Sequence, residues 1–188
     1  MRAVGAVDGI RRVRYTSPHP NDFSDRVIAA MAEVPTVCEH IHLPMQSGST
    51  SMLKKMLRRY SREDYLACVE RMRAAIPGLA LTTDIIVGFP SETDEEFADT
   101  LSLCQEVRFD DAFMFKFSPR EGTPATRMPA EWTIPDELVA TRFEFLLKTV
   151  RGISRENNLR RLGDTVEVLI EKIARDGQLL QARSRDFK

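Results

Sequence analysis

The segment from Asp84 to Glu92 constrains the fold of this chain more than any other stretch. It reads Asp-Ile-Ile-Val-Gly-Phe-Pro-Ser-Glu, so an apolar run enters a turn with glycine and proline, and an acid precedes a helix signal. Such a run is typical of a strand buried on both faces of a parallel sheet. In folds built on parallel sheets, ligands bind where the strands end. The sequence therefore predicts a binding site at the carboxyl end of such a sheet.

Segments of strand character alternate with segments of helical periodicity along most of the chain. Capping-box patterns at Ser61–Asp64 and Thr93–Glu96 mark two helix starts. The alternation predicts an α/β fold with a parallel sheet and right-handed crossovers, part of a (β/α) barrel. Four strands are too few to close a barrel, which takes about eight or a strongly curved six. We expect strands over residues 11–17, 40–44, 79–89 and 111–117, and helices over 21–34, 50–59, 61–76 and 93–107.

The C-terminal part of the sequence has a different character. After a loop at 124–134, a long helix is predicted from Thr133 to near Gly163, followed by strands at 166–173 and 178–183 around an Asp176-Gly177 hairpin turn. We therefore expect two domains, residues 1–162 and residues 163–188. A two-stranded hairpin alone is marginally stable, so the second domain is expected to be incomplete.

Charge and cysteine content exclude several classes of protein. The net charge is −1, so any binding of nucleic acid must depend on local patches. The sequence has neither a signal peptide nor an apolar run of about 18 residues, so we expect a cytoplasmic protein without membrane association. Cys38, Cys68 and Cys104 are far apart and match no compact metal motif. We interpret them as buried small apolar residues and predict no metal site in the chain.

Polar residues follow two of the predicted strands. Gln46, Ser47 and Ser49 come after the strand at 40–44, where their side chains could bind a ribose or a carboxylate, or could form an ordinary turn and helix cap. Gly88 allows a ligand to approach the backbone closely, and Glu92 could accept from an amine. The alternative for this pair is a turn with an acid at a helix N-terminus.

Three more polar residues are candidates at the same edge. Arg120 follows the strand at 111–117 and suits a carboxylate or phosphate, although an ion pair with Glu121 or Glu92 is equally consistent. His40 and His42 point to one face of a strand, but no third ligand stands at the spacing that a metal requires. His42 could instead face the interior of the barrel near the substrate.

Two basic clusters are candidates for contact with RNA. In the helical segment at 50–59, basic residues recur at a spacing of four, which gives either a solvated face or a patch for phosphates. The C-terminal hairpin could add to this patch. The candidates are Lys54, Lys55, Arg58, Arg59, Arg183 and Arg185.

A series of motifs resembles one known family. These are Ser17-Pro-His-Pro20, His42-Leu-Pro-Met-Gln-Ser-Gly-Ser49, Met56-x-Arg58-x-Tyr60, Thr83-Asp-Ile-Ile-Val-Gly-Phe-Pro-Ser-Glu-Thr93 and Phe117-Ser-Pro-Arg-Glu-Gly-Thr-Pro-Ala125. Together they resemble the radical S-adenosylmethionine (SAM) methylthiotransferases. Within that family they are most similar to the MiaB type, which modifies isopentenyladenosine beside the anticodon of tRNA. The branch acting on threonylcarbamoyladenosine is the nearest alternative.

The resemblance implies three parts: an N-terminal cluster-binding domain, a radical SAM partial barrel and a small RNA-binding TRAM domain. The chain resembles the later part of the barrel (1–162) and the start of TRAM (163–188). The Cys-x-x-x-Cys-x-x-Cys loop that holds the radical-generating [4Fe–4S] cluster in the family is absent from this sequence. We therefore expect a fragment that is inactive by itself, with SAM and [4Fe–4S] clusters as cofactors of the full-length enzyme.

In the family, reductive cleavage of SAM yields an adenosyl radical that abstracts hydrogen from adenine, an auxiliary cluster delivers sulfur, and a second SAM donates the methyl group. The resemblance places a set of residues of this chain around SAM, with the tRNA anticodon stem-loop as partner. No catalytic residue is assigned. The SAM-binding set is Gln46, Ser47, Ser49, Asp84, Ile86, Gly88, Glu92, Phe115, Phe117 and Arg120.

Two other functions are consistent with the residues alone. One is a non-catalytic RNA-binding module that uses the basic residues, and the other is an unrelated α/β barrel enzyme with its site at the same edge.

An incomplete barrel exposes a strand edge and apolar helix faces, so self-association is also expected.

Overall fold

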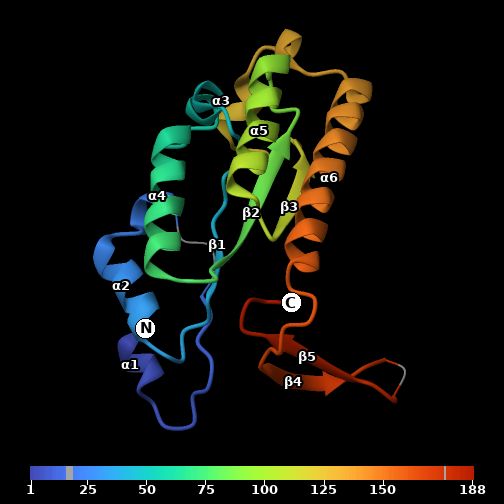
Figure 1. Ribbon diagram of the computed structural model, residues 1–188. Helices are drawn as coiled ribbons and strands as arrows, with labels where there is room; N and C mark the ends of the chain where they lie inside the picture. Colours follow the sequence, from blue (N-terminus) through green and yellow to red (C-terminus); the bar gives the residue numbers. More distant parts are fainter. Residues whose placement is uncertain (16–18, 176) are drawn as a thin grey trace.

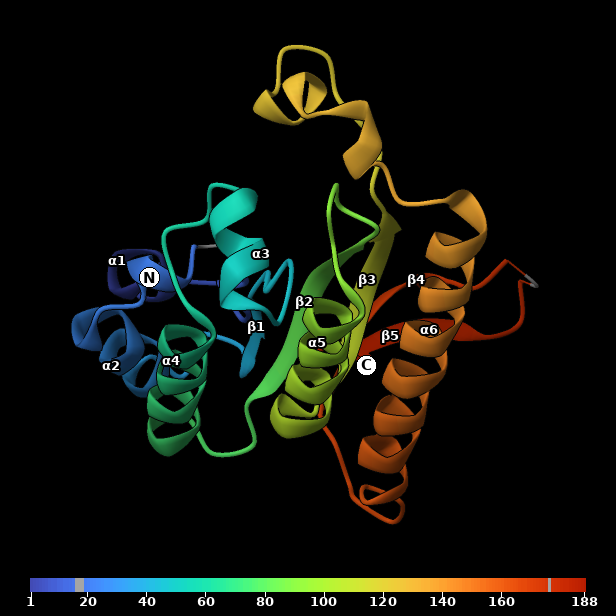
Figure 2. The ribbon, with the colours of Figure 1, turned by 90° about the horizontal axis from the view of Figure 1, so that it is seen from above.

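A computed structural model of the chain describes residues 1–15, 19–175 and 177–188. A parallel three-stranded sheet, ordered β1-β2-β3, forms its centre, and helices α4, α5 and α6 lie along one face of it (Figures 1 and 2). The α/β fold predicted from the alternation of elements is therefore confirmed. The strands of this sheet are β1 (His40–His42), β2 (Ala80–Val87) and β3 (Asp111–Lys116).

The remaining elements follow the predicted order. Three short 3-10 turns, at Pro20–Asp22, Pro124–Arg127 and Ala130–Trp132, interrupt the connections. The helices are α1 (Arg2–Gly5), α2 (Asp25–Glu33), α3 (Thr50–Lys55), α4 (Arg62–Ala75), α5 (Asp94–Val107) and α6 (Asp136–Leu159), and an antiparallel pair, β4 (Val168–Ile173) and β5 (Leu180–Ser184), ends the chain.

Both predicted capping boxes are present. At the start of α4, the Ser61 hydroxyl accepts from the Asp64 amide at 3.1 Å while the Asp64 carboxylate accepts from the Ser61 amide at 2.9 Å. Thr93 and Glu96 form the same reciprocal pair at the start of α5, at 3.2 and 2.9 Å. Each box satisfies two amides that the first turn of a helix leaves unpaired.

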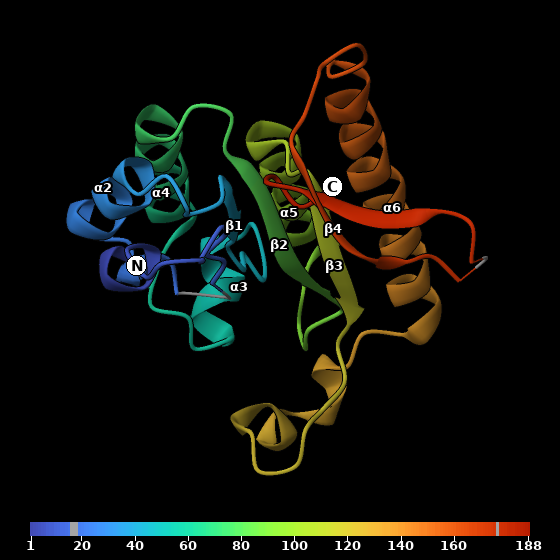
Figure 3. The same cartoon turned by 90° about the horizontal axis from the view of Figure 1, so that it is seen from below.

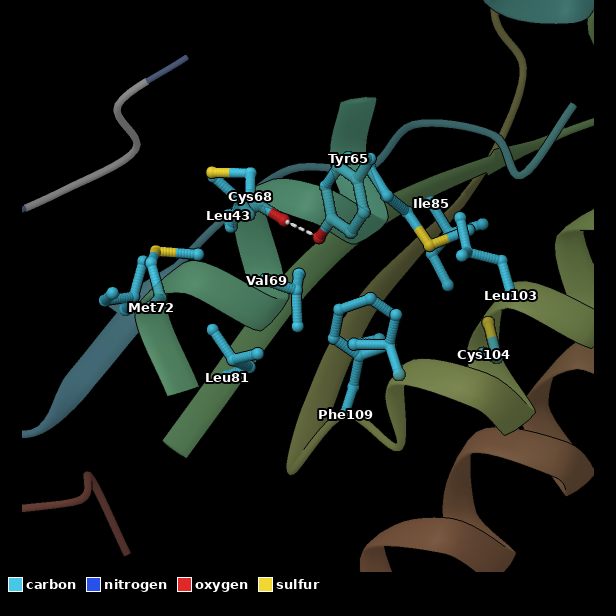
Figure 4. Close-up of a cluster of buried hydrophobic side chains, with 14 of the residues drawn as sticks. Leu43, Tyr65, Cys68, Val69, Met72, Leu81, Ile85, Leu103, Cys104 and Phe109 are labelled. Carbon is cyan, nitrogen blue, oxygen red and sulfur yellow. Dashed lines mark hydrogen bonds between the residues drawn. The ribbon is translucent and has the colours of Figure 1, made fainter. Parts of the chain in front are cut away.

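The core lies between the sheet and the helices that cover it. Ile41, Leu81 and Ile85 point from the strands to this side and are fully buried. Tyr65 of α4 packs among them near Phe109 and donates its hydroxyl hydrogen to the Leu43 carbonyl at 2.8 Å (Figure 4). This bond satisfies the one polar atom that the buried tyrosine brings into the core.

The other face of the sheet is more open and carries polar and aromatic residues. His42 of β1 and Asp84 of β2 point to this face, and so do Ile86 and the β3 residues Phe113 and Phe115. Phe113 is 58% exposed and Phe115 is 51% exposed. Because strand residues alternate between faces, the residues with binding chemistry are separated from the core.

The C-terminal hairpin lies at the end of the sheet where β1 and β2 begin (Figures 1 and 3). Arg185 forms hydrogen bonds of 2.7 Å to both carboxylate oxygens of Glu39 and donates to the Val37 carbonyl, also at 2.7 Å. Arg12 and Arg14 donate to backbone carbonyls of β5. The hairpin is thus fastened to the segments around the start of β1.

Several predicted boundaries were wrong. The strand expected at 11–17 is, in the described part of that range, a single bridge from Val13 to Val37; residues 16 and 17 lie outside the described residues. The helix expected over 50–59 ends at Lys55, because Leu57 adopts a left-handed backbone conformation with φ of 58°. Asp176 of the expected turn also lies outside the described residues, and the domain boundary near residue 162 stays a prediction.

Candidate functional site

A cavity of about 630 Å³ opens at the carboxyl end of the sheet. Gln46, Asp84, Ile86, Phe117 and Arg120, which the sequence analysis placed in one site, all line it. They come from the loop after β1, from β2, and from the segment that follows β3. Phe115 of the same set lines the cavity as well, so the structure brings together six of the proposed SAM-binding residues at the position expected for a parallel sheet.

The backbone of Gln46 is hydrogen-bonded to β2 through both its amide and its carbonyl. Its amide donates to the Asp84 carbonyl at 2.8 Å, and its carbonyl accepts from the Ile86 amide at 2.9 Å. Gln46 has a φ of 62°, a left-handed conformation that is unfavourable for a residue with a side chain. Its side chain is 8% exposed and lines the cavity. The two ladder bonds hold the backbone of Gln46 in this conformation at the cavity wall.

Aromatic residues form another wall of the cavity. Phe115 pairs with Ile86 across the sheet, and the Phe117 amide donates to the Val87 carbonyl at 2.8 Å. The Phe117 ring packs edge-to-face on Phe89, with centroids 4.9 Å apart. Rings fixed in this way offer a flat apolar surface on which a heteroaromatic base can stack.

The charge of the cavity wall is unbalanced. Arg58, Lys116 and Arg120 line it together with a single carboxylate, that of Asp84. Arg58 was assigned to RNA by the sequence analysis, but the chain reverses direction at Leu57 and brings Arg58 to the cavity. The excess of cations favours a ligand that carries a carboxylate or phosphate.

Ser47 and Ser49 lie beneath the cavity rather than in its wall. The Ser47 hydroxyl is 3.3 Å from the Thr100 hydroxyl of α5, and Ser49 bonds to Ser51. Gly48 lies so close to α5 that a Cβ there would stand 2.6 Å from the Thr100 Cα. These residues attach the loop after β1 to α5, and so they position Gln46 indirectly.

Glu92 is also absent from the cavity wall. Its side chain is fully buried, where its carboxylate accepts from the Gly88 amide at 2.9 Å and from the Arg142 guanidinium of α6 at 3.0 Å. Burial raises the pKa of this carboxyl, and the hydrogen bond from Gly88 and the charge of Arg142 oppose that shift. The contact to Arg142 joins residues 50 positions apart, and no sequence pattern indicated it.

The six basic residues assigned to RNA fall into two groups. Lys55, Arg183 and Arg185 form ion pairs with Glu96, Glu171 and Glu39. Lys54, Arg58 and Arg59 are exposed, Arg58 lines the cavity, and within the described part of the chain no carboxylate pairs with any of the three. The second group keeps its charge available for an external anion.

The residues of this chain do not fit an iron–sulfur cluster. Cys38, Cys68 and Cys104 are buried on separate elements, and burial raises the pKa of Cys104 to about 12 and also raises that of Cys68. Cluster ligands must be thiolates that converge on one point. Among residues 1–15, 19–175 and 177–188, no group of three or more histidine, cysteine or acidic side chains could hold a metal ion.

With this geometry established, the class of protein is clear from comparison with known families. Residues 2–104 match the model of the radical SAM superfamily, which is more than half of the chain. The chain belongs to the radical SAM superfamily. The fold of a solved member, coproporphyrinogen III oxidase of Escherichia coli, covers 73% of this chain and 31% of its own with a TM-score of 0.61. At 16% identity this likeness supports the fold alone.

The most informative relatives carry one name, tRNA-2-methylthio-N(6)-dimethylallyladenosine synthase. The protein of Caldicellulosiruptor saccharolyticus is 47% identical over 188 residues, and that of Acetivibrio thermocellus is 48% identical over 189, each covering 100% of this chain. The protein of Acidothermus cellulolyticus is 51% identical over 170 residues, or 90% of the chain. These matches confirm the predicted resemblance to the radical SAM methylthiotransferases. The chain spans 40%, 39% and 34% of the length of these relatives.

Proposed function

We propose that this chain is the SAM-binding part of a tRNA methylthiotransferase that acts on N6-dimethylallyladenosine. The observation that carries this proposal is the 47% identity, over the whole chain, to a relative with that name. The cavity supports it independently, because its wall combines an amide, a carboxylate, arginines and aromatic rings. These groups together can bind the base, the sugar and the carboxylate of a nucleoside that is linked to an amino acid.

Each part of the cavity wall has a role in this proposal. Asp84 accepts hydrogen bonds from ribose hydroxyls, and Gln46 bonds to the same sugar through its side-chain amide. Arg58 or Arg120 binds the amino-acid carboxylate as a charge-assisted pair. Ile86 and Phe117 cover the purine. When bound, SAM supplies an adenosyl group for hydrogen abstraction and a methyl group for transfer; these residues bind and orient it.

The RNA partner is proposed from the relatives' name and from charge. Lys54 and Arg59 are exposed near Arg58, which lines the cavity, and suit the phosphates of a tRNA anticodon stem-loop whose base enters it. We further propose that β4 and β5 begin a TRAM-like RNA-binding domain and that the enzyme acts in the cytoplasm. In the described chain, no helix is both long and apolar enough to span a bilayer.

Calorimetry with SAM tests the cofactor part of the proposal. Asp84→Asn should weaken binding about tenfold, because the amide replaces a charged acceptor for the ribose hydroxyls. Asp111→Asn is the matched control, since Asp111 lies at the opposite end of the sheet and outside the cavity. Equal affinity in the two variants would exclude this role for the cavity.

A chimera tests the RNA substrate. This chain would replace the corresponding segment of the Caldicellulosiruptor relative, and mass spectrometry of tRNA nucleosides would identify the product. We expect methylthiolation of dimethylallyladenosine. A product on threonylcarbamoyladenosine would favour the other branch, and salt-dependent tRNA binding without any product would favour a non-catalytic RNA-binding module.

A further inference from the structure

Four polar side chains form a continuous line on the open face of the sheet. The Asp84 carboxylate at the cavity lies 3.3 Å from Nε2 of His42. Nδ1 of His42 lies 3.0 Å from the Thr82 hydroxyl, and that hydroxyl lies 3.1 Å from Nε2 of His40. The line runs from the cavity to the end of the sheet at which the hairpin is fastened.

Counting the donors and acceptors along this line fixes which group donates at each contact. A carboxylate only accepts, so the proton of neutral His42 belongs on Nε2, where it faces Asp84. Nδ1 of His42 then carries a lone pair and accepts from the Thr82 hydroxyl. Because Thr82 has a single hydrogen to donate, its oxygen must accept the proton on Nε2 of His40. When His42 is neutral, this pattern requires the Nε2–H tautomer of both histidines.

We infer that His42 is a positioning residue that holds the Asp84 carboxylate in the cavity wall, and that Thr82 and His40 fix the orientation and tautomer of His42. This inference rests on the proposed function for its ligand, because Asp84 is there taken as the acceptor for the ribose of SAM. It gives a positioning role to a residue that does not line the cavity.

The surroundings of the two histidines support a fixed arrangement. The His42 side chain is 15% exposed and meets Phe113 of β3 edge-to-face, with ring centroids 5.7 Å apart. His40 stacks on Phe187 after β5, at 4.7 Å and 13° between the ring planes. Burial, together with the cationic Arg14, lowers the pKa of His40 to about 4. His40 is therefore neutral at physiological pH, so its ring can take the tautomer that the line requires.

Three substitutions of His42 separate this role from a merely structural one. Glutamine can place an N–H near the position of Nε2, so His42→Gln keeps the donor to Asp84. Asparagine places its oxygen near the position of Nδ1, so His42→Asn keeps the contact to Thr82 and loses the one to Asp84. We expect His42→Gln to bind SAM within about threefold of the unaltered chain, and His42→Asn and His42→Phe to bind about tenfold more weakly.

A nuclear magnetic resonance experiment on histidine ring nitrogens tests the tautomers without any ligand. The chain has three histidines, so long-range ¹H–¹⁵N spectra of the labelled protein contain three ring patterns. We expect the Nε2–H tautomer for His40 at neutral pH and for His42 when its ring is neutral. Thr82→Val removes the hydroxyl at nearly constant volume and should leave the tautomer of His40 mixed.

The two experiments distinguish failure of this inference from failure of the proposed function. A proton on Nδ1 of neutral His42, or binding by His42→Gln as weak as that by His42→Phe, would overturn the positioning role. If the tautomers are as expected but the unaltered chain binds no SAM, the line holds Asp84 as inferred and the proposed cofactor is the part that fails.

Discussion

The Glu92 carboxylate lies 3.0 Å from the Arg142 guanidinium, and the two side chains are 0% and 5% exposed. Arg142 also donates to the Glu92 carbonyl at 3.0 Å and to the Asp94 carboxylate at 2.7 Å. One guanidinium therefore joins α6 to the turn after β2 and to the first turn of α5. This turn adjoins the cavity wall. The buried pair therefore stabilises the site from the side away from the cavity.

Removing one partner of this buried pair should be strongly destabilising, because the other is left as an uncompensated charge. We expect Arg142→Met to lower the free energy of unfolding by about 3–5 kcal/mol in urea denaturation. Arg151→Met, at an exposed position of the same helix, should change it by less than about 0.5 kcal/mol. Equal effects at the two positions would show that the pair contributes nothing specific.

Gly88 should tolerate alanine less well than another glycine of similar backbone conformation. Gly88 has a φ of 78° and Gly122 has a φ of 81°, but a Cβ at Gly88 would stand 2.6 Å from Val139, while Gly122 faces open space. Gly122→Ala should cost about 1–2 kcal/mol from the backbone alone, and Gly88→Ala about 1–3 kcal/mol more from overpacking. Val139→Ala in the Gly88→Ala background should restore part of the difference in thermal denaturation; no restoration would mean that the clash is not its cause.

The hairpin should loosen in acid. Hydrogen bonds from Arg185 hold the pKa of Glu39 below its usual value, so the folded state favours the ionised form. The stabilisation is present above the ordinary glutamate pKa and is lost as the pH falls through the lower pKa of the folded state. The protection factors of the β4 and β5 amides, corrected for the intrinsic pH dependence of exchange, should therefore fall over that interval.

Glu39→Gln is the control for this acid effect. The variant should exchange faster already at neutral pH and should lose most of the acid dependence. Arg183 likewise holds the pKa of the Glu171 carboxyl below its usual value. The acid dependence of exchange in Glu171→Gln can therefore be compared with that in Glu39→Gln. Protection that is unchanged between neutral and acid pH in the unaltered chain would contradict the role of the Glu39 contact.

The unpaired basic residues should contribute more to the salt dependence of RNA binding than the paired ones. Lys54→Gln with Arg59→Gln should reduce the salt slope of tRNA binding by about 1.5–2, because each unpaired cation displaces counterions from phosphate. Lys55→Gln with Arg185→Gln should leave the slope nearly unchanged, since these residues are paired with Glu96 and Glu39. A filter-binding series in potassium chloride would measure both slopes. Equal reductions of the slope in the two double variants would contradict the difference between paired and unpaired residues.

Local sequence patterns predicted those parts of the fold that depend on near neighbours. The capping boxes at Ser61 and Thr93, the buried strand before Gly88 and the convergence of Gln46, Asp84 and Arg120 all follow from such patterns. Periodicity places a residue on a face, and the parallel sheet places the strand ends at one edge.

Long-range partners explain what the sequence did not predict. Glu92 was expected at the ligand, but its partner Arg142 is on α6, and nothing near either residue indicates the pair. Arg58 was expected on the continuous basic face of a helix, but a left-handed residue at Leu57 ends the helix first. The strand expected around Val13 alternates correctly, yet in the described residues it forms only one bridge.

The attachment of the hairpin has a consequence for how such chains diverge. Arg12 and Arg14 donate to the carbonyls of Arg183 and Ser184, and Arg185 donates to those of Pro35 and Val37. A main-chain oxygen is the same whatever side chain its residue bears. Substitutions along β5 can therefore accumulate, and its outward surface can vary, while the hairpin stays anchored in one orientation.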